Sequence, residues 1–413
     1  MEQHAREIIA RLKQNGHAAY MVGGYVRDKC LGRPVKDIDI ATSARPEQVA
    51  ELFPRTAPTG LKHGTVTVIM EGVPYEVTTF REEAEYEDFR RPREVRFIQD
   101  LEGDLRRRDF TMNAMAMDEE GRLIDPFGGL RDLRQGIIRC VGAADERFSE
   151  DALRMLRCIR FAAEYGLQIA PDTWEAIHKQ GRLLRHVAME RVLAELDRIM
   201  AGSDPLRGLR LLVDSRLYMW FKSGMNWPAE RWKRSVQYPP LASIGRIERP
   251  NLRWCMWLIA LQCDREEARQ FLRSLKCSNA MIREITALIE WHALAKNMRG
   301  EQEWKLASLR FDKQVPLDWL SIVESTSMES AESIAPDLIR CGAAWIGEMP
   351  VHHVRDLDVS GLDIQAFPGM KGPRIRRTLE RLLKETALGK LPNRKDKLLA
   401  QVRKWIEEPD HEQ

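Results

Sequence analysis

The hydrophobic pattern changes character at about residue 145, and this change most strongly limits how the chain can fold. Before it, short β-branched runs bounded by glycine or proline alternate with helical stretches, which is typical of a domain containing both strands and helices. After it, the pattern is helical and rich in Leu, Ala, Arg and Glu. With 413 residues, the chain has room for about two to four domains. We therefore predict an α+β fold in which a mixed domain precedes all-α parts.

Individual elements follow from the spacing of apolar residues. A helix is predicted over Glu2–Gln14, and residues 65–80 read as a hairpin around Gly72. The predicted strands are Ala19–Val22, Asp37–Ala41, Thr65–Glu71, Val73–Phe80, Val95–Phe97 and Ile137–Val141. The helical region contains tryptophans at helical spacing, which we interpret as core rather than as a base-stacking surface. These are Trp220, Trp227, Trp232, Trp254 and Trp257.

Proline and glycine clusters mark breaks in the helical region. They fall at 202–205, 227–250 and 361–373. We therefore expect four parts: a first domain over 1–145, a helical neck over 146–205, a helical body over 206–300 and a helical tail over 301–413.

Composition excludes several classes of protein. The formal net charge is only +3, with 44% hydrophobic and 31% charged residues, which indicates a folded protein without long disorder. The start of the sequence lacks the pattern of a signal peptide, and no apolar run is long enough to span a membrane. The seven cysteines are scattered and form no C-x-x-C pair. A cytoplasmic location and no membrane partner are expected.

Two carboxylates, Asp37 and Asp39, lie in a predicted strand with Ile38 between them. A period of two places both on one face, where their repulsion favours a divalent cation such as Mg²⁺. By itself such a pair more often marks a solvated face or a turn. Glu76, in the second hairpin strand, is either a third carboxylate of this site or an exposed strand residue, and the sequence favours neither.

Paired glycines precede these carboxylates. Gly23 and Gly24 follow a predicted strand and precede Arg27 at the start of a helical stretch. Glycine lets backbone amides approach phosphate, and an arginine fork can hold it. Neither the Walker pattern nor the dinucleotide fingerprint is present. Together, the glycines, the arginine and the carboxylates point to metal-assisted phosphoryl or nucleotidyl transfer.

Five ordered motifs resemble those of class II tRNA nucleotidyltransferases, a family that includes CCA-adding enzymes and bacterial poly(A) polymerases. The motifs span residues 23–28, 37–39, 107–114, 125–129 and 150–154. The resemblance implies a polymerase-β-like catalytic head followed by neck, body and tail, with Mg²⁺ on Asp37 and Asp39 and two-metal chemistry. It also implies nucleotide contacts from Gly24, Arg27, Arg108, Asp151, Arg154, Arg157 and Arg160.

The segment from Asp151 to Arg160 predicts how bases are selected. We expect one helix, with Ser149 as its N-cap, to carry Asp151 and the arginines at i+3 steps. An ionised Asp only accepts hydrogen bonds and an Arg only donates them. Cytosine and adenine each present an amino donor beside a ring acceptor, whereas uracil and guanine present the opposite order. An Asp151–Arg154 pair would therefore select C and A; Arg157 and Arg160 either reach phosphate or sugar, or brace the helix.

A densely charged segment over 81–93 reads as a mobile loop. A solvated connection is the simpler interpretation of its charge. It is similar to the flexible loop of full CCA-adding enzymes, which assists the change from C to A. The residues expected to act in it are Asp88, Arg90 and Arg91.

Positive charge gathers near the end of the chain. Residues 371–404 contain twelve Lys and Arg against three acidic residues, which predicts a surface that contacts RNA phosphates. A soluble basic helix face is the alternative. The segment is similar to the C-terminal region of Gram-positive CCA-adding enzymes. The predicted contacts are Lys371, Arg374, Arg376, Arg377, Arg394 and Lys395.

The leading hypothesis is addition of CCA to the 3′ end of tRNA from CTP and ATP, without a nucleic-acid template, with release of pyrophosphate. Asp37, Asp39 and Glu76 are the predicted catalytic residues. The alternatives are a poly(A) polymerase, a partial CC- or A-adding enzyme, and an inactive RNA-binding module. A monomer or a homodimer is expected.

Overall fold

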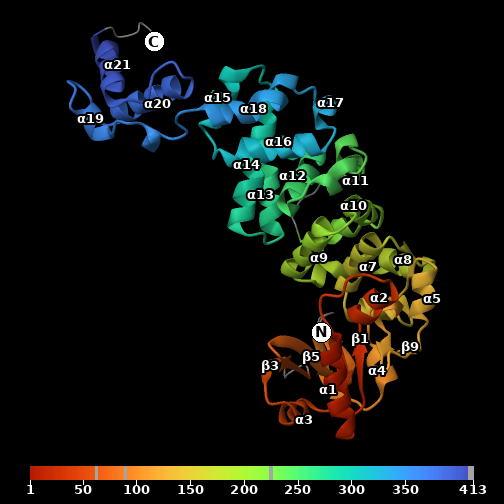
Figure 1. Cartoon of the computed structure of the whole chain (residues 1–413). Helices are drawn as coiled ribbons and strands as arrows, with labels where there is room; N and C mark the ends of the chain where they lie inside the picture. Colours follow the sequence, from red (N-terminus) through yellow and green to blue (C-terminus); the bar gives the residue numbers. More distant parts are fainter. Residues whose placement is uncertain (61–63, 88–90, 223–226, 408–413) are drawn as a thin grey trace. The chain divides into compact units, whose positions relative to one another are not determined.

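A computed structural model describes residues 1–60, 64–87, 91–222 and 227–407 (Figure 1). The chain divides into two compact units, Met1–Gly224 and Met225–Gln413, each of which is described by itself. The first unit contains the mixed sheet and the second is helical, which confirms the predicted α+β fold class. The finer division into four parts stays a prediction.

The main sheet of the first unit is mixed. Its strand order is β3 (Thr56–Gly60), β4 (Thr65–Met70), β5 (Val73–Thr79), β2 (Asp39–Thr42), β1 (Ala19–Val22), β8 (Ala116–Met117) and β9 (Leu123–Ile124). β4 and β5 form the predicted hairpin, with Glu71 and Gly72 at positive φ in its turn. β2 pairs antiparallel with β1 and parallel with β5, so β2 lies inside the sheet. A parallel pair, β10 (Ile137–Ile138) and β11 (Gln168–Ile169), lies outside it.

Some helices of the first unit pack against this sheet, and others follow it in the sequence. α1 (Glu2–Gln14) contacts β1 and β2, while α3 (Pro46–Leu52) contacts β4 and β5. The remaining α-helices are α2 (Gly24–Cys30), α4 (Leu101–Arg106), α5 (Gly129–Arg134), α6 (Ala144–Glu150), α7 (Leu153–Tyr165), α8 (Pro171–Gln180), α9 (Met189–Ala201) and α10 (Pro205–Asp214). Val22, Ala41 and Phe80 form a buried cluster with Leu105 and Ala116.

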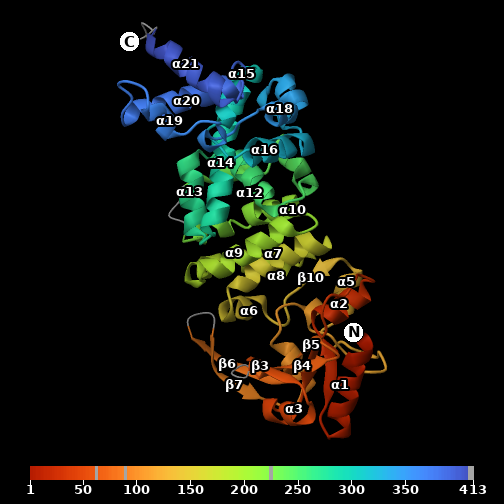
Figure 2. The same cartoon turned by 60° about the vertical axis from the view of Figure 1, so that its left-hand side comes forward.

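The charged segment over 81–93 is not the simple loop that its composition predicts. β6 (Arg81–Glu87) and β7 (Arg91–Phe97) pair antiparallel in a separate hairpin (Figure 2). Its register sets Glu82 opposite Arg96, an arrangement of opposite charges that stabilises a ladder. Of the expected loop residues, Asp88 and Arg90 lie outside the described residues, and Arg91 begins β7.

The second unit is built from helices with a tryptophan-rich core. The α-helices are α11 (Ala229–Ser235), α12 (Pro250–Ala260), α13 (Arg265–Ser274), α14 (Asn279–Ala295), α15 (Glu301–Ser308), α16 (Gln314–Ser325), α17 (Met328–Glu332), α18 (Pro336–Glu348), α19 (Gly361–Gln365), α20 (Pro373–Ala387) and α21 (Lys395–Glu407). Trp254 and Trp257 are fully buried, as predicted. Trp291 and Trp304 add an edge-to-face contact with centroids 4.9 Å apart. In the described residues, no helix is long and apolar enough to cross a membrane.

Trp220 departs from the core prediction. It ends a short 3₁₀ helix, Leu217–Trp220, in the first unit and is 38% exposed. Helical spacing does not predict the burial of Trp220, because this 3₁₀ helix is too short to bury every side chain that it carries.

Substitution of Gly129 should unfold the first unit more readily. A Cβ at Gly129 would lie 2.2 Å from the carbonyl oxygen of Thr111, so even alanine forces backbone movement. We expect Gly129→Ala to lower the free energy of unfolding by about 3 kcal/mol in a urea titration. Gly347→Ala is the control: no atom lies within 4 Å of the added Cβ, and its position in α18 should make alanine neutral or stabilising. Equal effects of the two changes would contradict the packing argument.

Candidate active site

The glycine turn after β1 brings an arginine close to the backbone. Gly23 has φ +70° and precedes α2. A Cβ there would lie 3.1 Å from Nη1 of Arg108 and 3.9 Å from Oδ2 of Asp39. Because L residues rarely adopt this φ and the space is already filled, only glycine fits without movement. Gly23 therefore lets Arg108 and Asp39 approach each other.

Three predicted carboxylates gather beside this turn. The register pairs Asp39 with Val22 and the next residue, Ile40, with Val77 in the parallel strand β5. Ile40 and Val77 are buried, so Asp39 and Glu76, one position before them, lie together on the opposite face. Asp37 precedes the strand rather than lying within it, because β2 begins only at Asp39.

Asp39 is electrostatically unusual. It keeps contact with solvent, but packed surroundings reduce its hydration, and Asp37 and Glu76 add negative charge. Burial first, and then these two charges, raise the pKa of Asp39 to about 6, while Arg108 opposes the shift. Oxygen ligands under mutual repulsion are a donor set that suits a hard divalent cation.

Arg108 is aimed by a buried carboxylate. Asp104 is 1% exposed and accepts hydrogen bonds from Arg107 Nε at 3.0 Å and Arg108 Nη2 at 3.2 Å. Burial alone would raise the pKa of Asp104, but the charges of Arg107 and Arg108 lower it. Nε of Arg108 is buried without a partner among the described residues, so it remains a donor for a ligand.

Arg27, which is expected to contact the nucleotide, belongs to an internal network of hydrogen bonds. It is 7% exposed, its Nε and Nη2 donate to Asp28 at 2.9 Å, and its Nη1 donates to Asn113 Oδ1 at 2.7 Å. Its guanidinium also lies 4.5 Å from the ring centroid of Tyr165. Gly24, next to it in the chain, would place a Cβ 3.4 Å from Nη2 of Arg27.

The network continues to Asp109, which sequence reasoning did not assign. Asn113 Nδ2 donates to Asp109 Oδ1 at 3.0 Å, and Arg157 donates to Asp109 Oδ2 from Nε at 2.8 Å and from Nη2 at 2.6 Å. Burial alone would raise the pKa of Asp109, but the Arg157 charge and the hydrogen bond from Asn113 lower it to about 2. Asp109 and Asn113 lie within a motif recognised in the sequence; their pairing with Arg157 required the fold.

The predicted base-reading helix is interrupted. α6 ends at Glu150, Asp151 is its C-cap, and α7 begins at Leu153, so Asp151 does not share a helix with the arginines. Ser149 is not an N-cap: it lies in the last turn of α6, and its hydroxyl donates to the Asp145 carbonyl at 2.8 Å. The helix starts earlier because its acidic residues at 145 and 146 occupy the first turn.

Arg154 contacts Asp151 through its backbone, whose N–H donates to the Asp151 carbonyl at 3.0 Å, and its side chain has other partners. Its Nη1 donates to Glu150 Oε2 at 2.7 Å, and its Nη2 donates to the Arg107 carbonyl at 3.0 Å. Asp151 instead accepts two hydrogen bonds from Arg191 of α9. Arg191 was absent from the predicted site. No local signal distinguishes it, because it lies 40 residues further along the chain.

Arg160 braces α7 against α9. Its Nε donates to Oε2 of Glu195 at 2.7 Å, its Nη1 donates to Glu164 at 3.1 Å, and both Arg160 and Glu195 are buried. Its guanidinium lies 3.8 Å from the ring centroid of Phe161. Of the two roles left open for Arg157 and Arg160, these contacts favour bracing.

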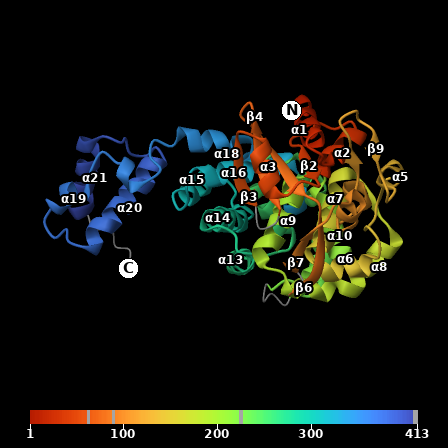
Figure 3. The same ribbon diagram turned by 90° about the horizontal axis from the view of Figure 1, so that it is seen from below.

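The predicted RNA-contacting residues lie on α20, α21 and the turns before them (Figure 3). All six are exposed, whereas Leu382, Leu383, Leu398 and Val402 are buried beneath. Three of them have acidic partners: Arg376 contacts Glu380, Arg394 contacts Asp396, and Lys395 contacts Asp363. The positive charge of this surface is therefore partly balanced by neighbouring carboxylates.

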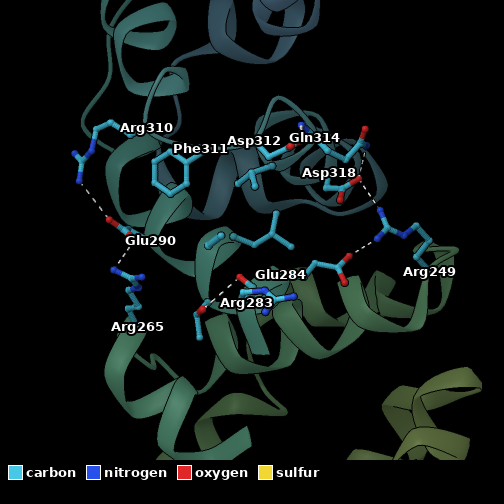
Figure 4. A pocket seen from close by; sticks show the side chains of 14 residues that line it. Arg249, Arg265, Arg283, Glu284, Glu290, Arg310, Phe311, Asp312, Gln314 and Asp318 are labelled. Atoms are coloured by element: carbon cyan, nitrogen blue, oxygen red, sulfur yellow. Dashed lines mark hydrogen bonds and ion pairs between the residues drawn. The ribbon is translucent and has the colours of Figure 1, made fainter. Parts of the chain in front are cut away.

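A cavity of about 640 Å³ in the second unit contains none of the predicted residues (Figure 4). Arg249 bridges Asp318, at 2.7 Å, and Glu284, while Arg265 and Arg310 share Glu290. These pairs connect helices around the cavity. In the first unit, oxygens of Asp118, Glu119 and Glu120 lie within 4.8 Å of one another, but Arg122 and Lys13 compensate them. Neither cluster resembles a catalytic centre.

Three stretches of the chain match known protein families. Residues 19–139 match the family "Poly A polymerase head domain", residues 166–225 match "Probable RNA and SrmB-binding site of polymerase A", and residues 246–402 match "tRNA nucleotidyltransferase domain 2 putative". The site described above lies in and just after the head domain. The fold is therefore that of a nucleotidyltransferase.

Full-length relatives define the family. The chain is 39% identical over 410 residues to the CCA-adding enzyme of Bacillus mycoides, covering 98% of this chain and 97% of the relative. It is 40% identical to that of Bacillus cytotoxicus, with 98% of both chains covered. The crystal structure of the Bacillus stearothermophilus CCA-adding enzyme in complex with CTP is 35% identical, has a TM-score of 0.83, and covers 98% of this chain and 97% of that one. This chain belongs to the CCA-adding enzyme family.

The Asp109–Arg157 pair should make stability depend on pH. A carboxylate whose pKa is lowered in the folded state stabilises it at neutral pH, and this contribution is lost as the pH falls from about 4 to about 2. We expect the free energy of unfolding, measured by urea titration at pH 7, to be about 3 kcal/mol higher for wild type than for Asp109→Asn. The difference should shrink below about pH 4. Asp145→Asn, which removes an exposed carboxylate paired with Lys179, should have a small effect; a pH-independent Asp109→Asn effect would contradict this account.

Proposed function

We propose that this protein adds C, C and A to the 3′ end of tRNA, using CTP and ATP and releasing pyrophosphate. The observation that carries the proposal is the convergence of Asp37, Asp39 and Glu76 beside Arg108 in the head domain. The relatives named CCA-adding enzymes, matched over almost the whole chain, support the choice of reaction. A Thermotoga maritima CCA-adding enzyme complexed with tRNA shares the fold, with a TM-score of 0.68 at 21% identity.

Asp37 and Asp39 would hold Mg²⁺, with Glu76 as a third carboxylate at the site. The fit rests on the donor set, because crowded carboxylate oxygens repel one another in the absence of a cation and suit this hard ion. When bound, Mg²⁺ activates the attacking hydroxyl and neutralises charge on the phosphates.

The chain itself supplies donors and shape for the transfer. Arg108 offers a buried N–H and a positive charge next to Asp39, where the triphosphate must approach. A preorganised cation in a partly desolvated site stabilises charge that develops on phosphate oxygens. The 3′ hydroxyl oxygen of the RNA loses its proton and forms a new bond to the α-phosphorus. The bond between the α-phosphorus and the oxygen that bridges to the β-phosphorus breaks, and pyrophosphate leaves.

Base selection is assigned to Asp151 and Arg154. Asp151 supplies an acceptor for the amino group of cytosine or adenine, and Arg154 supplies a donor for the adjacent ring nitrogen. Uracil and guanine would set acceptor against acceptor and donor against donor. Gly24 would give the nucleotide close access to the backbone. Arg27, Arg157 and Arg160 would complete the nucleotide site, with their own hydrogen bonds holding them in place.

The remaining assignments extend along the chain. The segment carrying Asp88, Arg90 and Arg91 would assist the change from C to A. The exposed basic residues of the tail, Lys371, Arg374, Arg376, Arg377, Arg394 and Lys395, would contact tRNA phosphates. The four-part division into head, neck, body and tail follows these roles. We place the protein in the cytoplasm, as a monomer or a homodimer.

Product length tests the reaction. With a defined tRNA transcript lacking its terminal CCA, and labelled CTP or ATP, we expect addition of two C and one A followed by arrest. Sequencing gels resolve each step. A long A tract would indicate a poly(A) polymerase, arrest after CC a partial enzyme, and no pyrophosphate release an inactive RNA-binding module.

Removal of the carboxylates should abolish transfer but not RNA binding. Asp37→Ala and Asp39→Ala are each expected to lower the incorporation rate by about 10³-fold or more, because the cation loses its ligands. Filter binding should still detect tRNA at wild-type affinity. Asp145→Ala, an exposed carboxylate of the same unit, serves as the control and should retain activity. Normal turnover in either site variant would refute the assignment.

A further inference from the structure

Arg191 of α9 is bound to the carboxylate that the proposed function uses to read bases. Its Nη1 and Nη2 donate to Oδ1 and Oδ2 of Asp151 at 3.2 and 2.7 Å. Oδ1 also accepts from the backbone N–H of Leu153 at 3.1 Å. A bidentate pair fixes both the position and the plane of a carboxylate. Asp151, which lies in the connection between two helices, is therefore held from a third.

This arrangement leaves Asp151 with limited acceptor capacity. An ionised carboxylate has about four lone-pair directions, and the three hydrogen bonds occupy three of them. One direction remains for a donor outside the protein. A single amino group, as cytosine and adenine each present, matches that remaining capacity.

The side chains of Asp151 and Arg154 bind different residues. Glu150 binds Arg154, at 2.7 Å, and Arg191 binds Asp151. If Asp151 and Arg154 bound each other, the acceptor and the donor would be satisfied internally, and a base would have to break an ion pair to enter. With Arg191 as its partner, Asp151 keeps its remaining acceptor direction for the edge of a base.

We propose that Arg191 is a positioning residue that determines base specificity by holding Asp151 in its reading orientation. The inference rests on the proposed function and extends it to a residue that does not touch the nucleotide. Without Arg191, the carboxylate rotates about its side-chain torsions and can pair with Arg154. Selection of C over U and of A over G then falls, because the ordered acceptor is lost.

The test measures discrimination rather than activity alone. With the full-length protein and tRNA transcripts ending before C or before A, kcat/KM is determined for CTP, UTP, ATP and GTP. We expect Arg191→Gln to lower the CTP/UTP and ATP/GTP ratios by about 10-fold or more, chiefly through a higher KM for CTP and ATP. Arg191→Lys keeps the charge without the planar fork, so it should lower these two ratios less than Arg191→Gln does. Lys179→Ala, which removes an exposed ion pair between α8 and α6, is the control and should keep wild-type ratios.

A double-mutant cycle separates positioning from a purely structural role. If Arg191 acts through Asp151, Asp151→Asn combined with Arg191→Gln should discriminate no worse than Asp151→Asn alone. Unchanged ratios in both Arg191 variants, or additive losses in the double variant, would overturn the inference. If Asp151→Asn alone leaves the ratios unchanged, the base-reading role fails and this inference with it. Failure of the proposed function itself is visible separately, as absence of CCA addition by wild type.

Discussion

A row of polar side chains from α2 to α7, buried except for the half-buried Arg157, is the interaction on which the rest of the site depends. Arg27 binds Asn113, Asn113 binds Asp109, and Asp109 binds Arg157. Buried charges of this kind are tolerated only when every member has its partner. The row therefore fixes α7 relative to the glycine turn that precedes α2.

The arginines around the site differ in the partners that their side chains have. Arg27, Arg157 and Arg160 have buried acidic or amide partners, so their charge is used to hold elements together. Arg108 differs because Asp104 aims it while its Nε has no partner in the described part of the chain. The motif over 107–114 thus contains Arg108 together with Asp109 and Asn113, which bind Arg157 and Arg27.

The sequence predicted elements well where local pattern decides the outcome. The helix at Glu2–Gln14, the strand at Ala19–Val22 and the β4–β5 hairpin formed as expected, since periodicity and turn residues agree there. Errors occurred where distant partners decide. The continuous helix through Asp151 was wrong because Arg191 and the backbone of Leu153 hold that residue outside both helices. Of the paired strands Arg81–Glu87 and Arg91–Phe97, only Val95–Phe97 was predicted, because backbone pairing rather than an apolar pattern defines the rest.

The spacing of Arg191 and Glu195 on α9 has a consequence for how this site can change during evolution. One turn apart on the same helix, they reach Asp151 and Arg160 respectively, while Val192 and Leu196 beside them are buried in the core. A slight shift of α9, caused by a change of volume among those core residues, would move both contacts together. Under the proposed role of Asp151, substrate choice can therefore change through substitutions in apolar packing, without any change to Asp151 itself.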